Sequence, residues 1–462
     1  MLYANRSLLP ILLVTILLLN AGNNYNYYFI EPANARLPAY EGDPILRDTD
    51  LKVEIFAEGL EKPTSMAFLG SNDILVLEQA NGTVKRIVNG TIQPQPVLDV
   101  SVANKSERGM LGIAVSKHEN GTTYVFLYYT EAKVEGSDIC PKPNRCEPGT
   151  EPLGNRLYRY ELVNNSLVNP MMLLDLPAVP GPAHNGGKVV IGPDNNVYLT
   201  IGDVGYRSST QNFPGRSDFN GTSAIYRITQ DGQPLPDNPL GSDADPPILK
   251  KYYAYGLRNS FGIAFDPVTG KLWDTENGAA YADEINLVEP GFNSGWRKLQ
   301  GLWETEGSTV GGDVMLNSSV FKQKADPNSV DLETFDGKGK YSDPAFIWFN
   351  NSAPTGLTFL HSDTLGKHHQ NHMFVGDFNA GNIYRFELNQ TRTGFILDGS
   401  LADKIEQSPE ELSQILFGQG FDSITDLQVS PEGYLYILSY GDGNIYRIVP
   451  ATLDSQIQNG TS

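Results

Sequence analysis

The stretch YLYILSYGDGNIYRIV, residues 434–449, contains an apolar strand, a turn of Gly, Asp and Asn residues, and a second strand that ends in Tyr-Arg-Ile. Alternating apolar residues on both sides of such a turn are typical of a β-hairpin. One hairpin cannot bury both of its faces, so hairpins of this kind have to pack against one another. The stretch therefore predicts a β-sheet that belongs to a larger assembly.

The same pattern returns along the chain. Its other copies are ILVLEQANGTVKRIV (74–88), TYVFLYYT (123–130) with NRLYRYEL (155–162), VYLTIGD (197–203) with SAIYRITQDG (223–232), KLWDTENG (271–278) with DEINLVEPG (283–291), and HMFVGDFNAGNIYRFEL (372–388). Six hairpins that stack radially bury a shared core. We therefore expect an all-β, six-bladed β-propeller over residues 51–452, with the active region at the central channel where loops converge.

Two stretches interrupt this rhythm. Residues 300–345 are polar and Gly-rich, which indicates an insertion loop over one face. In KIEQSPEELSQIL (404–416), Ser408 and Pro409 provide an N-cap and a first turn, so a short helix is expected there. Residues 453–462 are expected to form a tail.

Composition agrees with an all-β fold and excludes one class of partner. The 462 residues include 46 Gly, 23 Tyr and 20 Phe, which favour turns and aromatic strands over helices. The formal net charge of −20 repels phosphate backbones, so we expect no nucleic-acid partner. The same charge can attract divalent cations.

The N-terminus carries the apolar run LLPILLVTILLL (8–19), preceded by Arg6. This run is shorter than the roughly 20 residues of a membrane span and fits the core of a signal peptide. We interpret residues 1–22 as a signal peptide or membrane anchor and residues 23–50 as a linker. Cleavage could follow Gly22 or the A-x-A sequence at 33–35, and an uncut segment would tether the protein to a membrane.

Other features agree with an exported protein at the cell surface or outside the cell. Cys140 and Cys146 are close enough for a loop-closing disulfide, although two unpaired thiols are the alternative. Eleven N-x-S/T sequons, from Asn5 to Asn459, suit a glycoprotein, but such sequons also arise by chance in Asn-rich loops.

The segment PGPAHNGGKVVIGPDNNVYLTIGD (180–203) is the strongest candidate for chemistry. His184 lies in a Pro/Gly-rich loop, and Gly186 and Gly187 permit a tight turn that could present its imidazole to a cavity. An antiparallel return can bring Asp203 near His184. A carboxylate bonded to one ring nitrogen makes the other nitrogen a better base. The alternative is a structural loop histidine with an unrelated turn aspartate.

Several motifs resemble the PQQ-dependent soluble sugar dehydrogenases, the glucose/sorbosone dehydrogenase family. The matching stretches are ERGMLGIAV (107–115), the segment from His184 to Asp203, YAYGLRNSFGIAFDPVTGKLW (253–273) and TENGAAYADEINLVEPGFNSGW (275–296). Coverage extends from about Glu54 to Val449, which is nearly the whole chain. The resemblance implies a propeller enzyme that oxidises an aldose or related sugar, with hydride transfer to PQQ and an external electron acceptor.

The resemblance also assigns roles to individual residues near the substrate. His184 would be the general base, and Asp203 would orient it. Glu107 would line the sugar site. In IWFNNSAPTGLTFL (347–360), Trp348 would contact substrate and Asn351 the cofactor. A buried Trp is otherwise more often part of a core.

Cofactor contacts follow from the same comparison. Arg258 and Asn259 would contact PQQ, where an arginine can stabilise negative charge on a quinone oxygen. Asn277 would contact PQQ as well, and the carbonyls of Gly278 and Ala279 would bind Ca²⁺, a hard cation that prefers oxygen ligands. Asp283 and Glu284 follow in the same loop, where a metal role and a turn role are both open.

Some positions depart from the family pattern. Asn379 stands where the family has a lysine, Ser423 and Thr425 stand where some members have arginines that bind the carboxylates of PQQ, and Ser260 replaces a proline. Loss of cationic partners weakens the binding of a tricarboxylate. The alternative function is therefore a non-catalytic extracellular binding module that has lost PQQ binding.

The cluster GKHHQNH, with His368, His369 and His372, invites a metal interpretation. Adjacent histidines point apart in an extended chain, and no acidic or Cys partner lies at a matching spacing. We therefore expect a solvated loop there.

Overall fold

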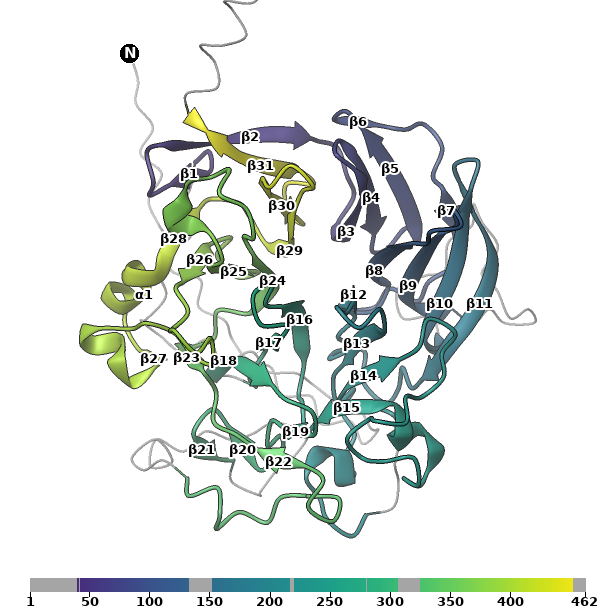
Figure 1. Ribbon diagram of the computed structural model, residues 1–462, viewed down its shortest axis with the longest axis vertical. Coiled ribbons are helices and arrows are strands. Elements are labelled where there is room, and N and C mark those ends of the chain that lie inside the picture. Colours follow the sequence, from purple (N-terminus) through teal and green to yellow (C-terminus); the bar gives the residue numbers. More distant parts are fainter. Residues whose placement is uncertain are drawn as a thin grey trace, which may run out of the picture.

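The β-sheets of this protein are arranged around a central axis (Figure 1). The computed structural model describes residues 40, 42–132, 152–216, 220–279, 281–305 and 325–451. Within these ranges the strands form six sheets of four to six strands and one two-stranded hairpin. The expected all-β propeller is confirmed.

The first three sheets follow one another along the chain. Sheet 1 contains β3 (Pro63–Gly70), β4 (Asp73–Glu78), β5 (Thr83–Val88), β6 (Thr91–Ile92) and β7 (Leu98–Asp99). Sheet 2 contains β8 (Met110–Lys117), β9 (Thr123–Ala132), β10 (Pro152–Val163) and β11 (Ser166–Leu176). Sheet 3 contains β12 (Val189–Ile191), β13 (Val197–Ile201), β14 (Ala224–Ile228), β15 (Tyr252–Tyr255), β19 (Phe292–Asn293) and β22 (Lys340–Tyr341).

The remaining sheets complete the circle. Sheet 4 contains β16 (Ser260–Phe265), β17 (Leu272–Glu276), β18 (Tyr281–Val288), β23 (Phe346–Asn350) and β27 (Ile405–Glu406). Sheet 5 contains β24 (Pro354–Phe359), β25 (Met373–Asp377), β26 (Ile383–Phe386), β28 (Leu416–Gln419) and β1 (Ile45–Leu46). Sheet 6 contains β29 (Ile424–Val429), β30 (Leu435–Ser439), β31 (Ile445–Pro450) and β2 (Leu51–Ala57).

The innermost strands form a closed ring around the axis. The strand β3 contacts β8, β8 contacts β12, β12 contacts β16, β16 contacts β24, β24 contacts β29, and β29 returns to β3. The loops that precede and follow these six strands therefore meet near the axis, which is the place where a propeller can assemble a site from distant segments.

The ring is closed by the N-terminal part of the chain. The strand β2 pairs antiparallel with β31 and is the outermost strand of sheet 6. Just before it, β1 pairs with β28 of sheet 5. The strand β1 lies within the range 23–50 that the sequence predicts as a linker, so regular structure begins earlier than Leu51.

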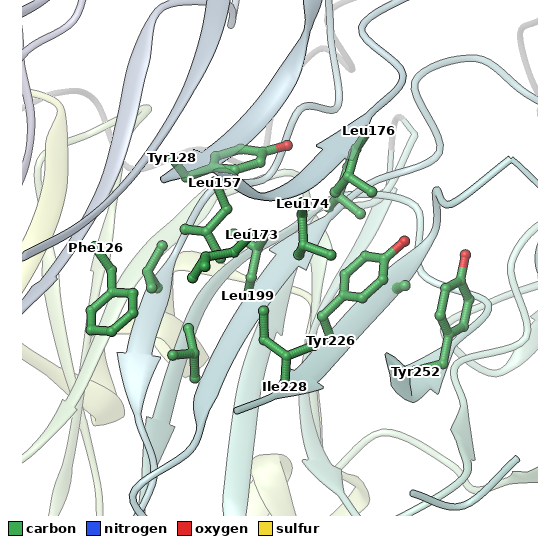
Figure 2. Close-up of a cluster of buried hydrophobic side chains, with 14 of the residues drawn as sticks. Phe126, Tyr128, Leu157, Leu173, Leu174, Leu176, Leu199, Tyr226, Ile228 and Tyr252 are labelled. Carbon is green, nitrogen blue, oxygen red and sulfur yellow. The ribbon is translucent and has the colours of Figure 1, made fainter. Parts of the chain in front are cut away.

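The hydrophobic core lies between neighbouring sheets. Figure 2 shows one such cluster, in which Phe126 and Tyr128 of sheet 2 lie near Leu199 and Tyr226 of sheet 3. All four side chains are buried, because alternate residues of each strand point to the same face and that face is covered by the next sheet.

Helical segments are few in the described part of the chain. The helix α1 (Pro409–Ile415) begins at its N-cap Ser408, whose side chain accepts a hydrogen bond from the backbone N–H of Glu411, so the short helix expected over 404–416 is confirmed. Short 3₁₀ segments are η1 (Ser209–Gln211), η2 (Pro247–Lys251), η4 (Lys367–His369) and η5 (Gly399–Asp403). None of the described helices is long and apolar enough to cross a membrane.

Parts of the predicted domain organisation lie outside the described residues. These parts are the N-terminal apolar run, Cys140 and Cys146, the tail 453–462, and residues 306–324 of the predicted insertion. The described ends of that insertion carry the hairpin β20 (Leu299–Gln300) and β21 (Trp303–Glu304) and the strand β22.

Candidate active site

A tight turn before β12 places His184 near the axis. Gly186 and Gly187 have φ values of 59° and 123°, as the sequence predicts for this turn, and His184 itself has a φ of 62°. A Cβ on Gly202 would lie 2.6 Å from the carbonyl oxygen of His184 and 2.4 Å from that of Arg258. Only glycine therefore lets the chain pass between the segments that carry these two residues.

His184 and Asp203 form a hydrogen-bonded pair, as the sequence predicts. The imidazole Nδ1 lies 2.7 Å from Asp203 Oδ1, and the Asp203 side chain is fully buried. Burial opposes ionisation of Asp203, but the attraction and hydrogen bond of His184, the nearby Arg297 and the N–H of Gly205 outweigh it, so the pKa of Asp203 lies below its usual range. An ionised carboxylate accepts a hydrogen bond from Nδ1–H, so the unprotonated Nε2 of a neutral His184 can act as a base.

Glu107 links the histidine to the next segment. Its Oε2 accepts the backbone N–H of His184 at 2.7 Å and the side-chain amide of Asn259 at 3.2 Å. The first of these bonds holds His184 in its left-handed conformation. The other oxygen, Oε1, has no hydrogen-bond partner among the described residues and can accept a hydrogen bond from a hydroxyl group.

Arg258 lies over the loop that follows β17. Its Nη1 donates to the carbonyls of Asn277 and Gly278, at 2.9 and 2.7 Å. Asn277 Oδ1 and Asn259 Oδ1 are both buried and lack a hydrogen-bond partner. This part of the site thus combines the Arg258 guanidinium with two amide oxygens that lack hydrogen-bond partners.

Asp283 connects this loop to the segment before β24. Its Oδ1 accepts the N–H of Gly278, and its Oδ2 accepts the N–H groups of Ser352 and Ala353, each at 2.7 Å. Despite these donors, burial raises its pKa to about 6. Asp283 therefore has the structural role in the turn that the sequence leaves open beside a metal role.

The contacts continue from that segment to sheet 5. The amide Nδ2 of Asn379 donates to the backbone carbonyl of Asn351 at 3.1 Å. Glu107 thus bonds both His184 and Asn259, and Arg258, which precedes Asn259, bonds Gly278. Asp283 then joins Gly278 to Ser352, which follows Asn351. Among the predicted site residues that the structure describes, these side chains and backbone groups are brought to one place. Ala279 adjoins Gly278 and is partly buried.

The position of Trp348 differs from the prediction. Its side chain is fully buried, and its ring packs against Phe346, Tyr384 and Phe386. It belongs to β23, which lies three strands out from the axis in sheet 4. Trp348 is therefore a core residue, and the substrate contact predicted for it is wrong.

Thr425 is buried, with 5% of its surface exposed. Its hydroxyl donates to the carbonyl of Pro63 at 2.9 Å in the interior. Ser423 is partly exposed and its hydroxyl bonds Asp422.

Two residues that the sequence analysis does not single out support the site. Trp296 donates its indole N–H to Asp203 Oδ2 at 2.7 Å, and Arg108 donates to the carbonyls of Ala178 and Gly181 in the loop that leads to His184. Trp296 ends the motif 275–296, so its position in that motif was the available signal. Arg108 directly follows Glu107, but nothing in the sequence indicates its partners.

The histidine cluster of residues 368–372 is not a simple solvated loop. His368 and His369 lie on the 3₁₀ segment η4, so their rings approach to 4.0 Å instead of pointing apart. Both Nε2 atoms contact Asp48 Oδ2, at 3.0 and 2.8 Å, and Asp48 precedes β2 far away in the sequence. The expected absence of an acidic partner was therefore wrong.

This cluster has the ligand types of a metal site, but its hydrogen bonds oppose that role. The guanidinium of Arg385 donates to His369 Nδ1 at 2.9 Å, so the proton of a neutral His369 is on Nε2 and points to Asp48. A metal at Nε2 needs that proton removed and the Arg385 contact broken. We interpret the cluster as a clamp that holds the segment before β2.

Fold and site together define an all-β propeller with an aspartate-supported histidine beside an arginine. The sequence profile of the family "Glucose / Sorbosone dehydrogenase" matches residues 60–447. This match covers most of the chain, and the chain belongs to that family.

Individual relatives agree with the family. The aldose sugar dehydrogenase YliI of Escherichia coli is 22% identical over 402 residues, which cover 87% of this chain and 93% of the relative. The quinoprotein glucose dehydrogenase B of Acinetobacter calcoaceticus is 28% identical over 272 residues, which cover 55% of this chain and 54% of the relative. An uncharacterised protein of Synechocystis is 26% identical, with 86% of each chain covered.

Solved structures share the fold. The PQQ-bound aldose sugar dehydrogenase of Streptomyces coelicolor superposes with a TM-score of 0.59 at 22% identity, with 87% of this chain and 99% of that chain covered. The apo form of the soluble aldose sugar dehydrogenase of Escherichia coli gives a TM-score of 0.63 at 19% identity, with coverage of 87% and 99%.

Proposed function

We propose that this protein is a quinoprotein sugar dehydrogenase whose six radial sheets act as the blades of the propeller. The substrate is an aldose or related sugar, and the electrons pass to an external acceptor. The observation that carries the proposal is the contact of His184 with buried Asp203 beside Glu107, Asn259 and Arg258. Family membership and relatives that are named quinoprotein glucose dehydrogenase and aldose sugar dehydrogenase support it.

The side chains present fit an anionic quinone and a hard cation. The guanidinium of Arg258 would face negative charge on the quinone, and Asn259, Asn277 and Asn351 would supply neutral contacts. The unpartnered Asn277 Oδ1 and the carbonyls of Gly278 and Ala279 form an oxygen-only set that suits Ca²⁺. In this set the Gly278 carbonyl also accepts a hydrogen bond from Arg258.

The residues of this chain then divide the work. When bound, PQQ supplies a quinone carbonyl that accepts the hydride of the sugar carbon. His184 Nε2 takes the proton of the sugar hydroxyl, and Asp203 holds the proton on Nδ1 and stabilises the imidazolium that forms. Glu107 Oε1 accepts a second hydroxyl of the sugar and orients it. Arg258 stabilises negative charge near its guanidinium.

The test is reconstitution with PQQ and Ca²⁺. We expect a change in quinone absorbance when the apoprotein binds PQQ, and dye reduction on addition of an aldose. The variant His184→Ala should bind PQQ nearly as well but lose a factor of about 10² to 10⁴ in kcat, the usual contribution of a general base. His361→Ala, which removes an exposed histidine, is the matched control and should leave kcat unchanged.

Failure to bind PQQ at micromolar concentration would contradict the proposal. It would favour the non-catalytic binding module, in which Asn379, Ser423 and Thr425 stand where cations would be needed.

We also propose that the protein is exported and glycosylated. Among the sequons in the described residues, Asn89, Asn120 and Asn164 are exposed, whereas Asn81 is buried. A glycan needs an exposed acceptor, so these three turns are the candidates. Mass spectrometry of the protein from its native host would test both export and occupancy. Unmodified Asn89, Asn120 and Asn164 would contradict the glycan assignment.

A further inference from the structure

Trp296 lies between the His184–Asp203 pair and Arg258 in the candidate active site. Its side chain is buried, with 2% of its surface exposed, and its backbone N–H donates to the carbonyl of Gly256 at 2.9 Å. The residue follows β19 in sheet 3 and comes from neither of the loops that carry His184 and Arg258.

The indole nitrogen acts on the carboxylate that supports the histidine. Trp296 Nε1 donates to Asp203 Oδ2 at 2.7 Å, while Asp203 Oδ1 accepts from His184 Nδ1 at 2.7 Å and from Gly205 N at 2.8 Å. A carboxylate with donors on both oxygens is fixed in its plane and in its charge distribution. Trp296 thus donates to Asp203 Oδ2, the carboxylate oxygen that does not bond His184.

The indole ring also lies beside the arginine. The guanidinium of Arg258 is 5.6 Å from the ring centroid of Trp296, and that of Arg297 is 5.2 Å from it. Both distances lie in the range of a cation–π contact. The Trp296 side chain therefore contacts both Asp203, which supports the predicted base, and Arg258, the predicted cofactor contact.

We propose that Trp296 is a positioning residue that couples the His184–Asp203 pair to Arg258. The proposal rests on the function proposed above. The N–H sets how strongly Asp203 holds the proton of His184, and the ring face sets where Arg258 lies. Without the N–H, negative charge on Asp203 is less well stabilised at Oδ2, so Asp203 attracts the imidazolium of His184 more strongly.

Two substitutions separate these effects. Trp296→Phe removes the N–H and keeps a ring under Arg258, whereas Trp296→Leu removes both. Trp273→Phe is a matched control, because Trp273 is equally buried and its Nε1 has no hydrogen-bond partner among the described residues. The control is the same Trp-to-Phe substitution at a tryptophan that does not bond Asp203.

For the holoenzyme we expect Trp296→Phe to lower kcat about 10-fold, with KM changed less than about 2-fold, because a small displacement of a catalytic group has effects of this size. The acid limb of the pH profile of kcat/KM should move to higher pH, since the imidazolium is favoured. Trp296→Leu should in addition weaken the PQQ titration. Trp273→Phe should change none of these quantities.

A second readout does not need the cofactor. In apoprotein labelled with ¹⁵N-histidine, the Nδ1–H resonance of His184 should move in Trp296→Phe and stay in place in Trp273→Phe. Movement of this resonance supports the coupling even if the wild-type protein shows no turnover, an outcome that would contradict only the proposed function. An unmoved resonance, or identical pH profiles for the two Phe variants, would overturn the inference.

Discussion

At the scale of single residues, buried carboxylates gather on one pair of strands. Asp274 and Glu276 of β17 lie opposite Asn286 and Glu284 of β18. All four are buried, and both oxygens of Asp274 lack hydrogen-bond partners. Burial raises the pKa of Asp274 to about 7 and that of Glu284 to about 8. The interior of sheet 4 therefore favours protonated acids.

This arrangement predicts a pH-dependent stability. A carboxyl whose pKa is raised in the folded state stabilises the fold fully below the unfolded pKa, and that stability is lost as the pH rises through the folded value. Because the pKa of Asp274 is near 7, we expect Tm to fall between about pH 4 and pH 8 in the absence of added cations.

The variant Asp274→Asn tests which residue is responsible. Its amide can donate where Ser260 Oγ and Asn286 Oδ1 have no partner, so we expect higher Tm at pH 8, a gain of about 1–3 kcal/mol, and a shallower pH dependence. Exposed Asp331, replaced by Asn, is the control. The same slope in Asp274→Asn as in wild type, measured by scanning fluorimetry, would show that Asp274 does not titrate in this range.

At the scale of elements, the strand β2 closes the propeller. It pairs along its length with β31, from Leu51 opposite Pro450 to Ala57 opposite Ile445. The segment before it is held by the clamp of Asp48 with His368, His369 and Arg385. The chain therefore fixes the closing strand at both its pairing edge and its approach.

Removal of this strand should open the ring. A chain that starts at residue 58 leaves the edge of β31 unpaired, and we expect a lower Tm and aggregation. A chain that starts at residue 40 keeps every described residue, β1 and β2 included, and is the control. A synthetic peptide of residues 45–57 should raise the Tm of the shorter chain, because a strand can add to an exposed sheet edge. Equal melting of the two truncated chains would contradict a closing role.

At the scale of the whole molecule, one buried ion pair links three sheets across the axis. Lys188, just before β12 of sheet 3, contacts Asp426 Oδ1 on β29 of sheet 6. Asp426 Oδ2 accepts from Ser65 Oγ and Met66 N on β3 of sheet 1, each at 3.0 Å. These contacts hold the inner strands together at the point where the ring of sheets closes.

Breaking this pair should destabilise the whole fold. Lys188→Met leaves Asp426 buried without its cation, and the expected loss is about 3–5 kcal/mol. The double variant Lys188→Met with Asp426→Asn should lose less than the sum of the two single variants, because no unpaired charge then remains. Chemical denaturation measures the three differences. Strictly additive losses would show that the two side chains do not act as a pair.

Much of the fold could be predicted from the sequence alone. The repeated hairpins specify strands and turns locally, because alternate residues along each strand point to opposite faces of the sheet. The glycines at 186 and 187 and the N-cap Ser408 were predictable for the same reason, because each satisfies a local backbone requirement. The pairing of His184 with Asp203 was also predictable, since a single antiparallel return joins them.

Tertiary structure alone decided the contacts between distant segments. The motif that contains Trp348 predicts a site residue, but its strand lies on the outer side of sheet 4. Asp48 and His369, or Trp296 and Asp203, come together only when the ring closes. Local sequence patterns determine strands and turns through backbone and burial preferences, whereas the order of strands around the axis determines which side chains share one carboxylate.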